Sequence, residues 1–291
     1  MGEKPPVILT IAGFDPSSGA GITADVKTIA AHGCYGVACI TALTVQSTSG
    51  VRRVEPVDPA LIRDTLEELD ADLDIAAVHI GMLGSSKVVK AVADFLEVAD
   101  KSGNTSAKRR PARLSNIVLD PILKSSSGAD LLDSAGTRVL AERLISLADV
   151  ITPNTDETAV LTGLRVNDLD TMREAAAKLH QMGASAVVIT GGDLEKAIDL
   201  LSYRSSKGTQ QEVFKAERQR STSTHGTGCA FATSMACHLA LDRGLAEATL
   251  LSKTYVGAAI ANAQILGKGT GPVHHLYRMT QQRRATITSG E

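Results

Sequence analysis

Three glycine-rich stretches of this chain could bring backbone amides close to an anionic ligand. The first, at residues 11–22, reads IAGFDPSSGAGI, the second, at 223–231, reads STHGTGCAF, and the third is Thr190-Gly191-Gly192-Asp193. Glycine lets the backbone approach a ligand closely, and the amides that open a helix favour a negative charge. The stretches indicate phosphate chemistry, although each one alone is a weak signal.

The first stretch contains Gly19-x-Gly21-x-x-Ala24, which superficially matches a dinucleotide-binding fingerprint. Several residues separate this match from the preceding strand, and no acidic residue ends the next one, so we disfavour that interpretation. A plain turn is an alternative, but a loop at the carboxyl end of a strand is where open α/β sheets bind ligands. No G-x-x-x-x-G-K-[ST] motif occurs, so any use of a nucleoside triphosphate does not involve a P-loop.

Cys229 follows the second glycine pair and opens an apolar helix. A thiol at a helix N-terminus has a reason for a lowered pKa, which would make Cys229 reactive. The alternative is that Cys229 is a small buried core residue, as free cysteines often are. Both interpretations remain open at this point.

Composition excludes several classes of protein. The chain has 291 residues, with 30 Lys and Arg against 32 Asp and Glu, a formal net charge of −2, so nucleic-acid binding is disfavoured. No apolar run approaches the roughly 18 residues that span a bilayer. The four cysteines form no CxxC pair, so neither a disulfide framework nor a zinc finger is indicated. We expect a soluble, cytoplasmic protein without membrane or nucleic-acid partners.

Short β-branched runs alternate with longer segments of helical periodicity, the pattern of βα units around a mainly parallel sheet. The fold class expected is therefore α/β. The expected strands are Val7–Ala12, Gly36–Val45, Ile75–Leu83, Asn116–Leu123, Asp149–Thr152 and Ala186–Thr190, followed by an antiparallel hairpin of Ala197–Tyr203 and Gln211–Glu217.

The expected helices lie between and after these strands. One begins at Asp58-Pro59, an N-cap followed by proline. We expect a single domain over 1–291, with a polar loop insertion at about 100–115 and a peripheral tail at about 276–291 that lacks order. The other helices expected are Ser85–Ala99, Gly136–Leu147, Leu169–Met182, Gly228–Asp242 and Leu245–Leu266.

Six short motifs occur in order along almost the whole chain. They are TIAGFDPSSGAGI from residue 10, TALTVQST from 41, IGML from 80, TPNTDET from 152, THGTGC from 224 and GPVHH from 271. As a set they resemble the hydroxymethylpyrimidine/phosphomethylpyrimidine kinases of thiamine biosynthesis, a branch of the ribokinase-like superfamily. The resemblance implies a three-layer α/β/α sandwich that uses ATP and Mg²⁺ to phosphorylate 4-amino-5-hydroxymethyl-2-methylpyrimidine and then its monophosphate.

By this similarity, five residues line a pyrimidine pocket. Gln46 suits an aminopyrimidine because one side chain supplies both a donor and an acceptor, although a polar strand-end residue facing water is the alternative. Met82 forms an apolar wall for a flat ring as readily as it packs a core. The five residues are Gly13, Asp25, Thr44, Gln46 and Met82.

The similarity also implies a nucleotide site formed by Asn154, Thr190 and Gly192, with Glu157 and Asp120 near Mg²⁺, which prefers oxygen ligands. Thr155 is expected as the N-cap of the following helix. A glutamate in that helix's first turn is favourable whatever its function, and Asp120 before Pro121 could simply begin a turn.

The catalytic residues implied are Gly226, Thr227, Gly228 and Cys229, whose amides would hold the transferring phosphoryl group. Many kinases of this fold have aspartate as the base where this chain has Cys229. Two rivals remain: a pyridoxal kinase of the same branch and a noncatalytic ligand sensor. Gln46 favours the pyrimidine, and retention of Asn154, Glu157 and the G-T-G-C loop argues against a sensor. Relatives of this fold often form homodimers, which is a possibility here.

Overall fold

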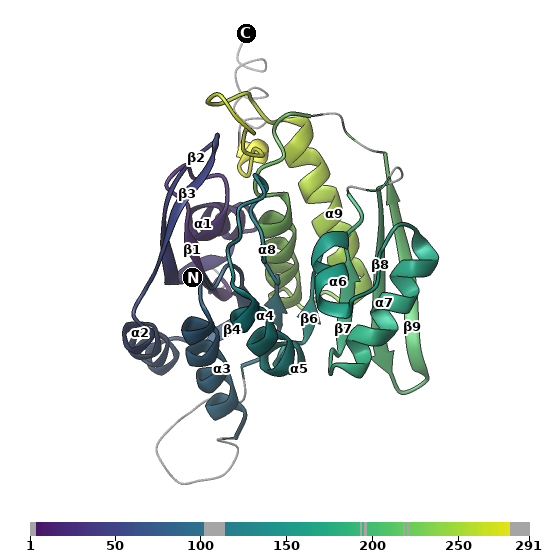
Figure 1. Ribbon diagram of the computed structural model, residues 1–291, viewed down its shortest axis with the longest axis horizontal. Coiled ribbons are helices and arrows are strands. Elements are labelled where there is room, and N and C mark those ends of the chain that lie inside the picture. Colours follow the sequence, from purple (N-terminus) through teal and green to yellow (C-terminus); the bar gives the residue numbers. More distant parts are fainter. Residues whose placement is uncertain are drawn as a thin grey trace.

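The computed structural model describes residues 4–101, 114–192, 194, 197–217, 219 and 221–279. The strands in these ranges form one sheet in the order β3-β2-β1-β4-β5-β6-β7-β8-β9 (Figure 1). The six strands from β2 to β7 along this order pair in parallel, whereas β3, β8 and β9 pair antiparallel. The strands are β1 Val7–Phe14, β2 Tyr35–Ser47, β3 Gly50–Pro56, β4 Ile75–Ile80, β5 Ile117–Leu119, β6 Val150–Ile151, β7 Ala186–Ile189, β8 Ala197–Ser205 and β9 Gly208–Ala216.

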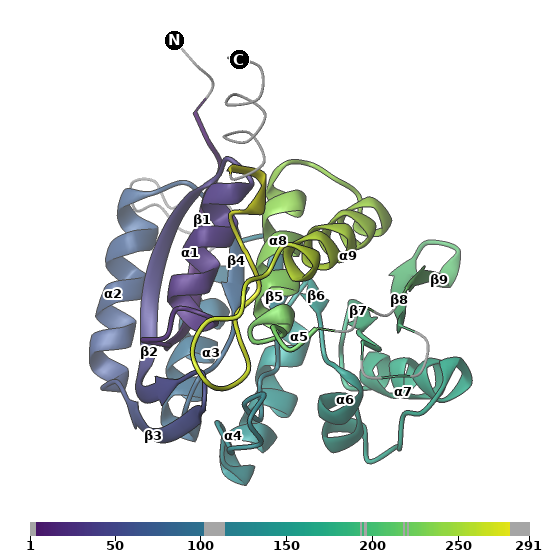
Figure 2. The ribbon, with the colours of Figure 1, turned by 90° about the horizontal axis from the view of Figure 1, so that it is seen from above.

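Helices cover both faces of the sheet (Figures 1 and 2). One apolar cluster joins one face to α2, α3, the segment from α4 to α5, and α7, and a second joins the other face to α1, α8 and α9. This is the three-layer α/β/α architecture that the resemblance implied, and the mainly parallel sheet confirms the α/β fold class expected from the sequence pattern. The helices are α1 Gly21–Ala31, α2 Pro59–Asp72, α3 Ser86–Lys101, α4 Ser134–Val139, the π-helix η1 Leu140–Leu144, α5 Ile145–Leu147, α6 Thr155–Thr162, α7 Leu169–Gln181, α8 Thr227–Ala240 and α9 Leu245–Ala261.

The predicted start of α2 is confirmed. The Asp58 carboxylate accepts a hydrogen bond of 2.9 Å from the Ala60 amide, and Pro59 occupies the first helical position. Proline is tolerated there because that amide would have no partner within the helix. Ile62 and Leu66 then face the core.

Two strands leave the sheet sooner than their apolar runs predict. The run Ile75–Leu83 pairs only to Ile80, and the run Asn116–Leu123 pairs only over Ile117–Leu119. The remaining residues of both runs stay apolar because they are buried above the sheet edge, as Leu83 and Leu123 are. The apolar sequence pattern therefore extends beyond the last residue of each strand that pairs in the sheet.

Three other differences concern elements that the patterns described incompletely. Strand β3 was not predicted, because its sequence GVRRVEP is a charged edge strand with little apolar alternation. The helix expected over Gly136–Leu147 contains the π-helical turn η1, and the last helix ends at Ala261 rather than at Leu266.

The expected insertion at about 100–115 lies mostly outside the described residues, and so does most of the expected tail at about 276–291. Within the described part of the chain, none of the helices combines the length and the apolar character needed to cross a membrane.

Candidate active site

The carboxyl ends of the parallel strands bring most of the predicted site residues to one edge of the sheet. Gly13 is near the end of β1, and Asp120, Asn154 and Thr190 follow β5, β6 and β7. Asn154 and Thr190 form a parallel bridge, in which the Thr190 amide donates to the Pro153 carbonyl at 3.0 Å. Ligands of open α/β sheets bind at this kind of edge.

The two glycine-rich loops, at 13–21 and 223–228, pack directly against each other. Gly226 has a φ of 82°, and a side chain there would collide with the carbonyl oxygen of Gly19. A side chain at Gly19 would in turn meet the ring of His225. Glycine is therefore required at this contact because the two backbones approach too closely for a Cβ atom.

Asp15 organises the first loop. Its carboxylate accepts hydrogen bonds from the amides of Ser17 at 2.8 Å, Gly19 at 3.2 Å and Ala20 at 3.0 Å. Burial raises the pKa of the Asp15 carboxyl, but hydrogen bonds from His225 and Ser17 outweigh it and hold that pKa below its ordinary value. Asp15 therefore acts as a fixed anionic centre of the loop.

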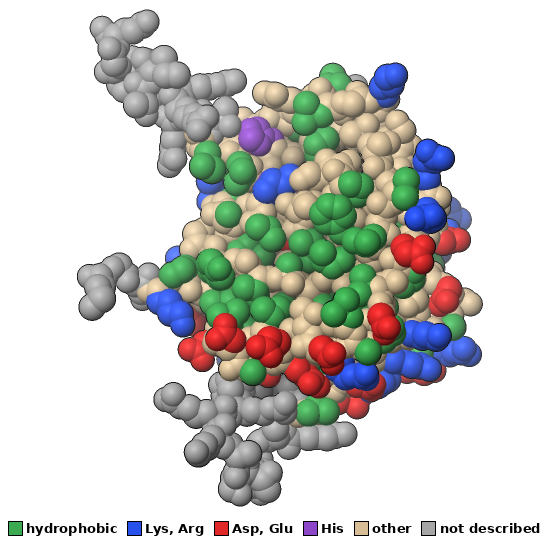
Figure 3. Space-filling model, turned by 90° about the vertical axis from the view of Figure 1, so that its left-hand side faces the viewer, with side chains coloured by type: hydrophobic (Ala, Val, Ile, Leu, Met, Phe, Trp, Pro, Cys, Tyr) green, Lys and Arg blue, Asp and Glu red, His purple; other side chains and the backbone are tan. Residues whose placement is uncertain are grey.

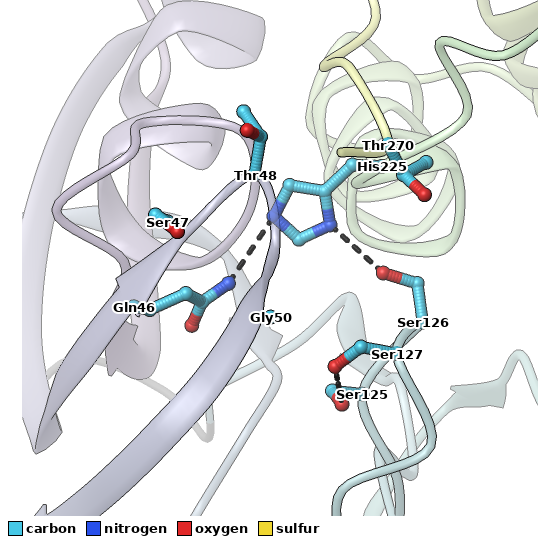
Figure 4. Close-up of a pocket in the computed structure, with 9 residues that line it drawn as sticks. All are labelled: Gln46, Ser47, Thr48, Gly50, Ser125, Ser126, Ser127, His225 and Thr270. Carbon is cyan, nitrogen blue, oxygen red and sulfur yellow. Dashed lines mark hydrogen bonds between the residues drawn. The ribbon is translucent and has the colours of Figure 1, made fainter. Parts of the chain in front are cut away.

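His225 connects three separate segments of the chain, and Figure 4 shows its contacts with two of them, at Gln46 and Ser126. Its Nε2 lies 2.9 Å from Asp15 Oδ2 and 3.3 Å from Nε2 of Gln46, and its Nδ1 lies 3.1 Å from the hydroxyl of Ser126. The residue is 8% exposed. The sequence motifs alone assign no role to Asp15, His225 or Ser126, although Asp15 and His225 lie inside the glycine-rich stretches.

Gln46 lines a small polar pocket rather than facing open water. Its Oε1 lies 3.2 Å from the hydroxyl of Thr44, which also donates to the Phe14 carbonyl at 3.0 Å. Figure 4 shows Gln46 pointing toward His225 across the pocket. The other lining residues are Ser47, Thr48, Gly50, Ser125, Ser126, Ser127 and Thr270.

Gly13 and Met82 are in contact. A Cβ atom at Gly13 would lie 2.9 Å from the Met82 sulfur, and Met82 belongs to a small apolar cluster with Ala42 and Leu131. The structure thus joins two of the predicted pocket residues. Met82 packs in this cluster while its sulfur borders the glycine loop, and its role as a wall for a flat ring stays a prediction.

Asp25, in contrast, is fully buried beneath the loops. Its carboxylate accepts hydrogen bonds from Thr10 at 2.7 Å and Thr233 at 2.9 Å, and His79 Nδ1 lies 3.4 Å away. Both oxygens are therefore engaged by protein groups. No sequence motif indicates this cluster, because its four residues belong to β1, α1, β4 and α8 and are distant along the chain.

Cys229 lies in the first turn of α8, as expected, but the expected lowered pKa is wrong. Burial raises the pKa of the Cys229 thiol well above its ordinary value, and the negative charges of Asp120 and Asp25 raise it further. These effects outweigh the favourable influence of the helix terminus. Cys229 is therefore a neutral thiol in this arrangement.

Asn154, not Thr155, is the N-cap of α6, which corrects our expectation for Thr155. The Asn154 side chain accepts from the Glu157 amide at 2.8 Å, and Glu157 Oε2 accepts from the Asn154 amide at 2.9 Å. This reciprocal pair is a capping box. Thr155 is the first helical residue, since the side chain of the preceding Asn154 already accepts the hydrogen bond from the Glu157 amide.

Two buried carboxyls, Asp120 and Glu157, form an acidic centre. Burial raises the pKa of Asp120, and the charges of Glu157 and Asp25 raise it further. Burial also raises the pKa of Glu157, to about 7. The carboxylate of Asp120 lies beside the start of α8, since a Cβ atom at Gly228 would come 3.7 Å from Asp120 Oδ2.

These carboxyls fit a divalent cation that arrives with a phosphate ligand. Repulsion between buried acids is relieved by a nearby cation. Among the described residues, no three His, Cys, Asp or Glu side chains come together in a set that could hold a metal ion unaided. An ion such as Mg²⁺, which takes its other ligands from phosphates and water, suits this centre.

The segment after β7 offers backbone rather than side chains. Gly192 is exposed, and nothing lies within 4 Å of a Cβ atom built there. The preceding Gly191 amide donates to Asp199 Oδ1 at 3.0 Å, and Lys253 pairs with Asp199 Oδ2 at 2.7 Å. This buried ion pair anchors the strand end and leaves Gly192 open to a ligand.

Known proteins resemble the chain over most of its length. The sequence pattern described as phosphomethylpyrimidine kinase matches residues 15–274. The hydroxymethylpyrimidine/phosphomethylpyrimidine kinase of Haemophilus influenzae is 37% identical over 270 residues, covering 92% of this chain and 96% of that protein. The thiamine biosynthesis bifunctional protein ThiED of Geobacter sulfurreducens is 41% identical over 271 residues, so 92% of this chain spans only 52% of that relative.

A solved structure shows the same fold. The pyridoxal kinase of Bacillus subtilis, determined as an ADP complex, superposes with a TM-score of 0.81 at 32% identity, covering 95% of this chain and 100% of that chain. The pyrimidine and pyridoxal enzymes therefore share this architecture, and the fold alone does not separate them.

Proposed function

The chain belongs to the phosphomethylpyrimidine kinase family, and we propose that it transfers a phosphoryl group from ATP to 4-amino-5-hydroxymethyl-2-methylpyrimidine and then to the monophosphate. The observation that carries the proposal is the contact between the two glycine loops, with Gln46 on one side and the acidic centre on the other. A flat polar ring and a triphosphate can meet between these groups.

We assign the binding of the pyrimidine to Gly13, Thr44, Gln46 and Met82. Gln46 supplies both donor and acceptor to an aminopyrimidine edge, while the Met82 side chain covers an apolar part of the ring. Asp25 acts from below the pocket, because its charge helps to keep the thiol of Cys229 neutral. Its role is therefore electrostatic rather than direct contact with the substrate.

We assign the nucleotide to Asn154, Thr190 and Gly192, and Mg²⁺ to Asp120 and Glu157. When bound, the ion neutralises and orients the phosphates. The amides at the start of α8, from Gly226 to Cys229, have no partners within the helix and stabilise the charge of the transferring phosphoryl group. Catalysis then rests on positioning and charge stabilisation, with little need for a strong base.

Cys229 holds the attacking hydroxyl by hydrogen bonding rather than by taking its proton as a thiolate. The raised pKa of its thiol supports this role. The hydroxyl proton would leave late in the transfer, to water or to an oxygen of the transferred phosphoryl group, as suits a loose transition state in which the nucleophile is only weakly deprotonated.

A direct assay tests the proposed function. Purified protein is incubated with ATP and Mg²⁺ and with hydroxymethylpyrimidine, its monophosphate or pyridoxal, and products are resolved by mass. We expect both pyrimidines to gain a phosphoryl group. Pyridoxal is included because a pyridoxal kinase has a similar structure. Efficient phosphorylation of pyridoxal without turnover of either pyrimidine would favour the rival kinase. Ligand binding without any transfer would favour the sensor.

We also propose that the chain is one kinase domain over 1–291 that works in the cytoplasm as a homodimer. Apolar side chains gather on the face of the molecule that contains β2 (Figure 3). Ile40, Leu43 and Val45 of β2 are among the exposed apolar residues, and such a patch is typical of an interaction surface. Sedimentation equilibrium measures the oligomeric state, and a monomer at micromolar concentration would contradict the dimer.

A further inference from the structure

His225 is the polar centre of the site, yet the proposed function gives it no task. It reaches the first glycine loop through Asp15, the substrate strand through Gln46 and the 125–127 loop through Ser126. The side chain is buried, so each of its ring nitrogens depends on these neighbours for hydrogen bonds.

The contact with Asp15 determines what Nε2 of His225 can do. An ionised carboxylate only accepts hydrogen bonds, so Nε2 must carry the proton that it donates across 2.9 Å. The amide nitrogen of Gln46, 3.3 Å from the same Nε2, is also a donor. At the other end of this amide, the single hydroxyl proton of Thr44 is shared between Gln46 Oε1 and the Phe14 carbonyl. The amide is thus poorly matched at both ends.

A rotation of the Gln46 amide by 180° removes both mismatches. Its oxygen then accepts the second, longer branch of the single Nε2–H bond that Asp15 already receives, in place of two donors facing each other. Its nitrogen donates to the Thr44 hydroxyl, whose own proton is free for the Phe14 carbonyl. One N–H and one oxygen lone pair of Gln46 remain for the pocket. They match a ring nitrogen beside an exocyclic amino group, which is the edge of a 4-aminopyrimidine.

We propose that His225, fixed as an N–H donor by Asp15, sets the orientation of the Gln46 amide and thereby makes the site specific for a ring with an amino group next to a ring nitrogen. The inference rests on the assignment of Gln46 to the pyrimidine in the proposed function. His225 is a positioning residue in this scheme, since it acts on the substrate through Gln46.

The test compares three substitutions at position 225. His225→Phe keeps a ring but removes both nitrogens, His225→Asn is too short to reach Gln46, and His225→Gln offers an amide N–H near the former Nε2. Steady-state kinetics use hydroxymethylpyrimidine and the analogue 5-hydroxymethyl-2-methylpyrimidine, which lacks the amino group. Thermal unfolding followed by circular dichroism identifies any variant that fails to fold, and the Asn and Gln variants preserve the comparison if Phe does not fold.

We expect the Phe and Asn variants to raise KM for the aminopyrimidine by roughly 10- to 100-fold, as for loss of a buried hydrogen-bonded contact, with kcat reduced less than about threefold. For the amino-free analogue, KM should rise by less than about threefold in the same variants. The ratio of the two KM values, which measures discrimination between the two substrates, should therefore fall. His225→Gln should recover most of the lost affinity. Equal losses for both substrates, or no rescue by Gln, would overturn the proposal in favour of a purely structural role.

A double-mutant cycle isolates the path through Gln46. Gln46→Leu alone should raise KM by roughly 10- to 100-fold, and adding His225→Phe should change it by less than about threefold, because the orienting group then has nothing to orient. If the rise in KM for the double variant equals the product of the rises for Gln46→Leu and His225→Phe, the proposal is contradicted. Absence of wild-type pyrimidine turnover would instead contradict the proposed function, so the two failures are distinguishable.

Discussion

The two halves of the site are built differently. On the pyrimidine side, side chains from three segments meet at His225, and the glycine loops press against each other. On the nucleotide side, Asn154 and Glu157 cap a helix, and Gly192 presents open backbone. In the proposed site, the substrate ring is recognised by matched side chains, whereas the triphosphate is held by backbone and buried charge. Substitutions of the same kind should therefore act unequally on the two halves.

The largest effect is expected from Gly226→Ala. A Cβ atom there collides with the Gly19 carbonyl and requires a strained φ of 82°, so the anion loop must shift. Loss of its aligned amides should reduce kcat by roughly 10²–10³-fold. The matched substitution in the nucleotide half is Gly192→Ala, where no protein atom lies within 4 Å of the added Cβ. The backbone amide is kept, so kcat should stay within about twofold, and any effect should fall on KM for ATP. Comparable losses of kcat in Gly226→Ala and Gly192→Ala would contradict the distinction drawn between the two halves of the site.

An intermediate effect is expected from Glu157→Gln on stability. The folded protein holds the Glu157 proton up to a pKa of about 7, whereas the ordinary value is 4.5. The folded state therefore binds more protons between these values, and stability falls as pH rises through this window and levels off above it. The raised pKa of Glu157 corresponds to a change in the free energy of unfolding on the order of 3 kcal/mol across this window. Asp120, whose pKa is also raised, contributes to the same dependence of stability on pH.

Chemical denaturation at pH 5 and pH 8 measures this effect. The Gln variant stays neutral and keeps an acceptor for the capping box, so it should lose less stability than the wild type between the two pH values. ATP and Mg²⁺ should stabilise the wild type more than the variant. A wild type that becomes more stable from pH 5 to pH 8 would contradict the assignment of a raised pKa to Glu157.

The smallest effect is expected from Cys229→Ser. A lowered thiol pKa would have predicted a loss of 10²-fold or more, in the range for a general base. Because burial and neighbouring charges raise that pKa instead, we now expect kcat to fall by less than about tenfold. The pH–rate profile should keep its shape in the variant. A larger loss, together with disappearance of a limb of the profile, would restore Cys229 as the base.

The sequence was sufficient for eight of the nine strands that the described residues form, because apolar runs alternating with helical periodicity depend on local chemistry. The resemblance implied that Asp120, Asn154 and Thr190 serve one nucleotide site, and the structure places all three after parallel strands, which end on the same side of the sheet. Whether those residues bind the ligands assigned to them stays a prediction. Strand β3 was missed because a charged edge strand carries little apolar pattern.

The sequence was insufficient wherever a property depended on distant neighbours. The pKa of Cys229 was predicted from its helix position alone, but Asp120 and Asp25 come from other elements and reverse its direction. The environment of Asp25 likewise required Thr10, His79 and Thr233 to be assembled. His225 stood in a quoted motif, yet its partners could be found only in three dimensions.

The contact between Gly19 and Gly226 has a consequence for the order of folding. The hydrogen bond between Asp15 and His225 joins positions 210 residues apart, so closing this loop carries a large entropic cost that earlier contacts must reduce. During synthesis, the strands from β1 to β9 emerge before the start of α8 does. A growing chain therefore cannot assemble the pocket until nearly all of the sheet is available, and an incomplete chain should not capture substrate.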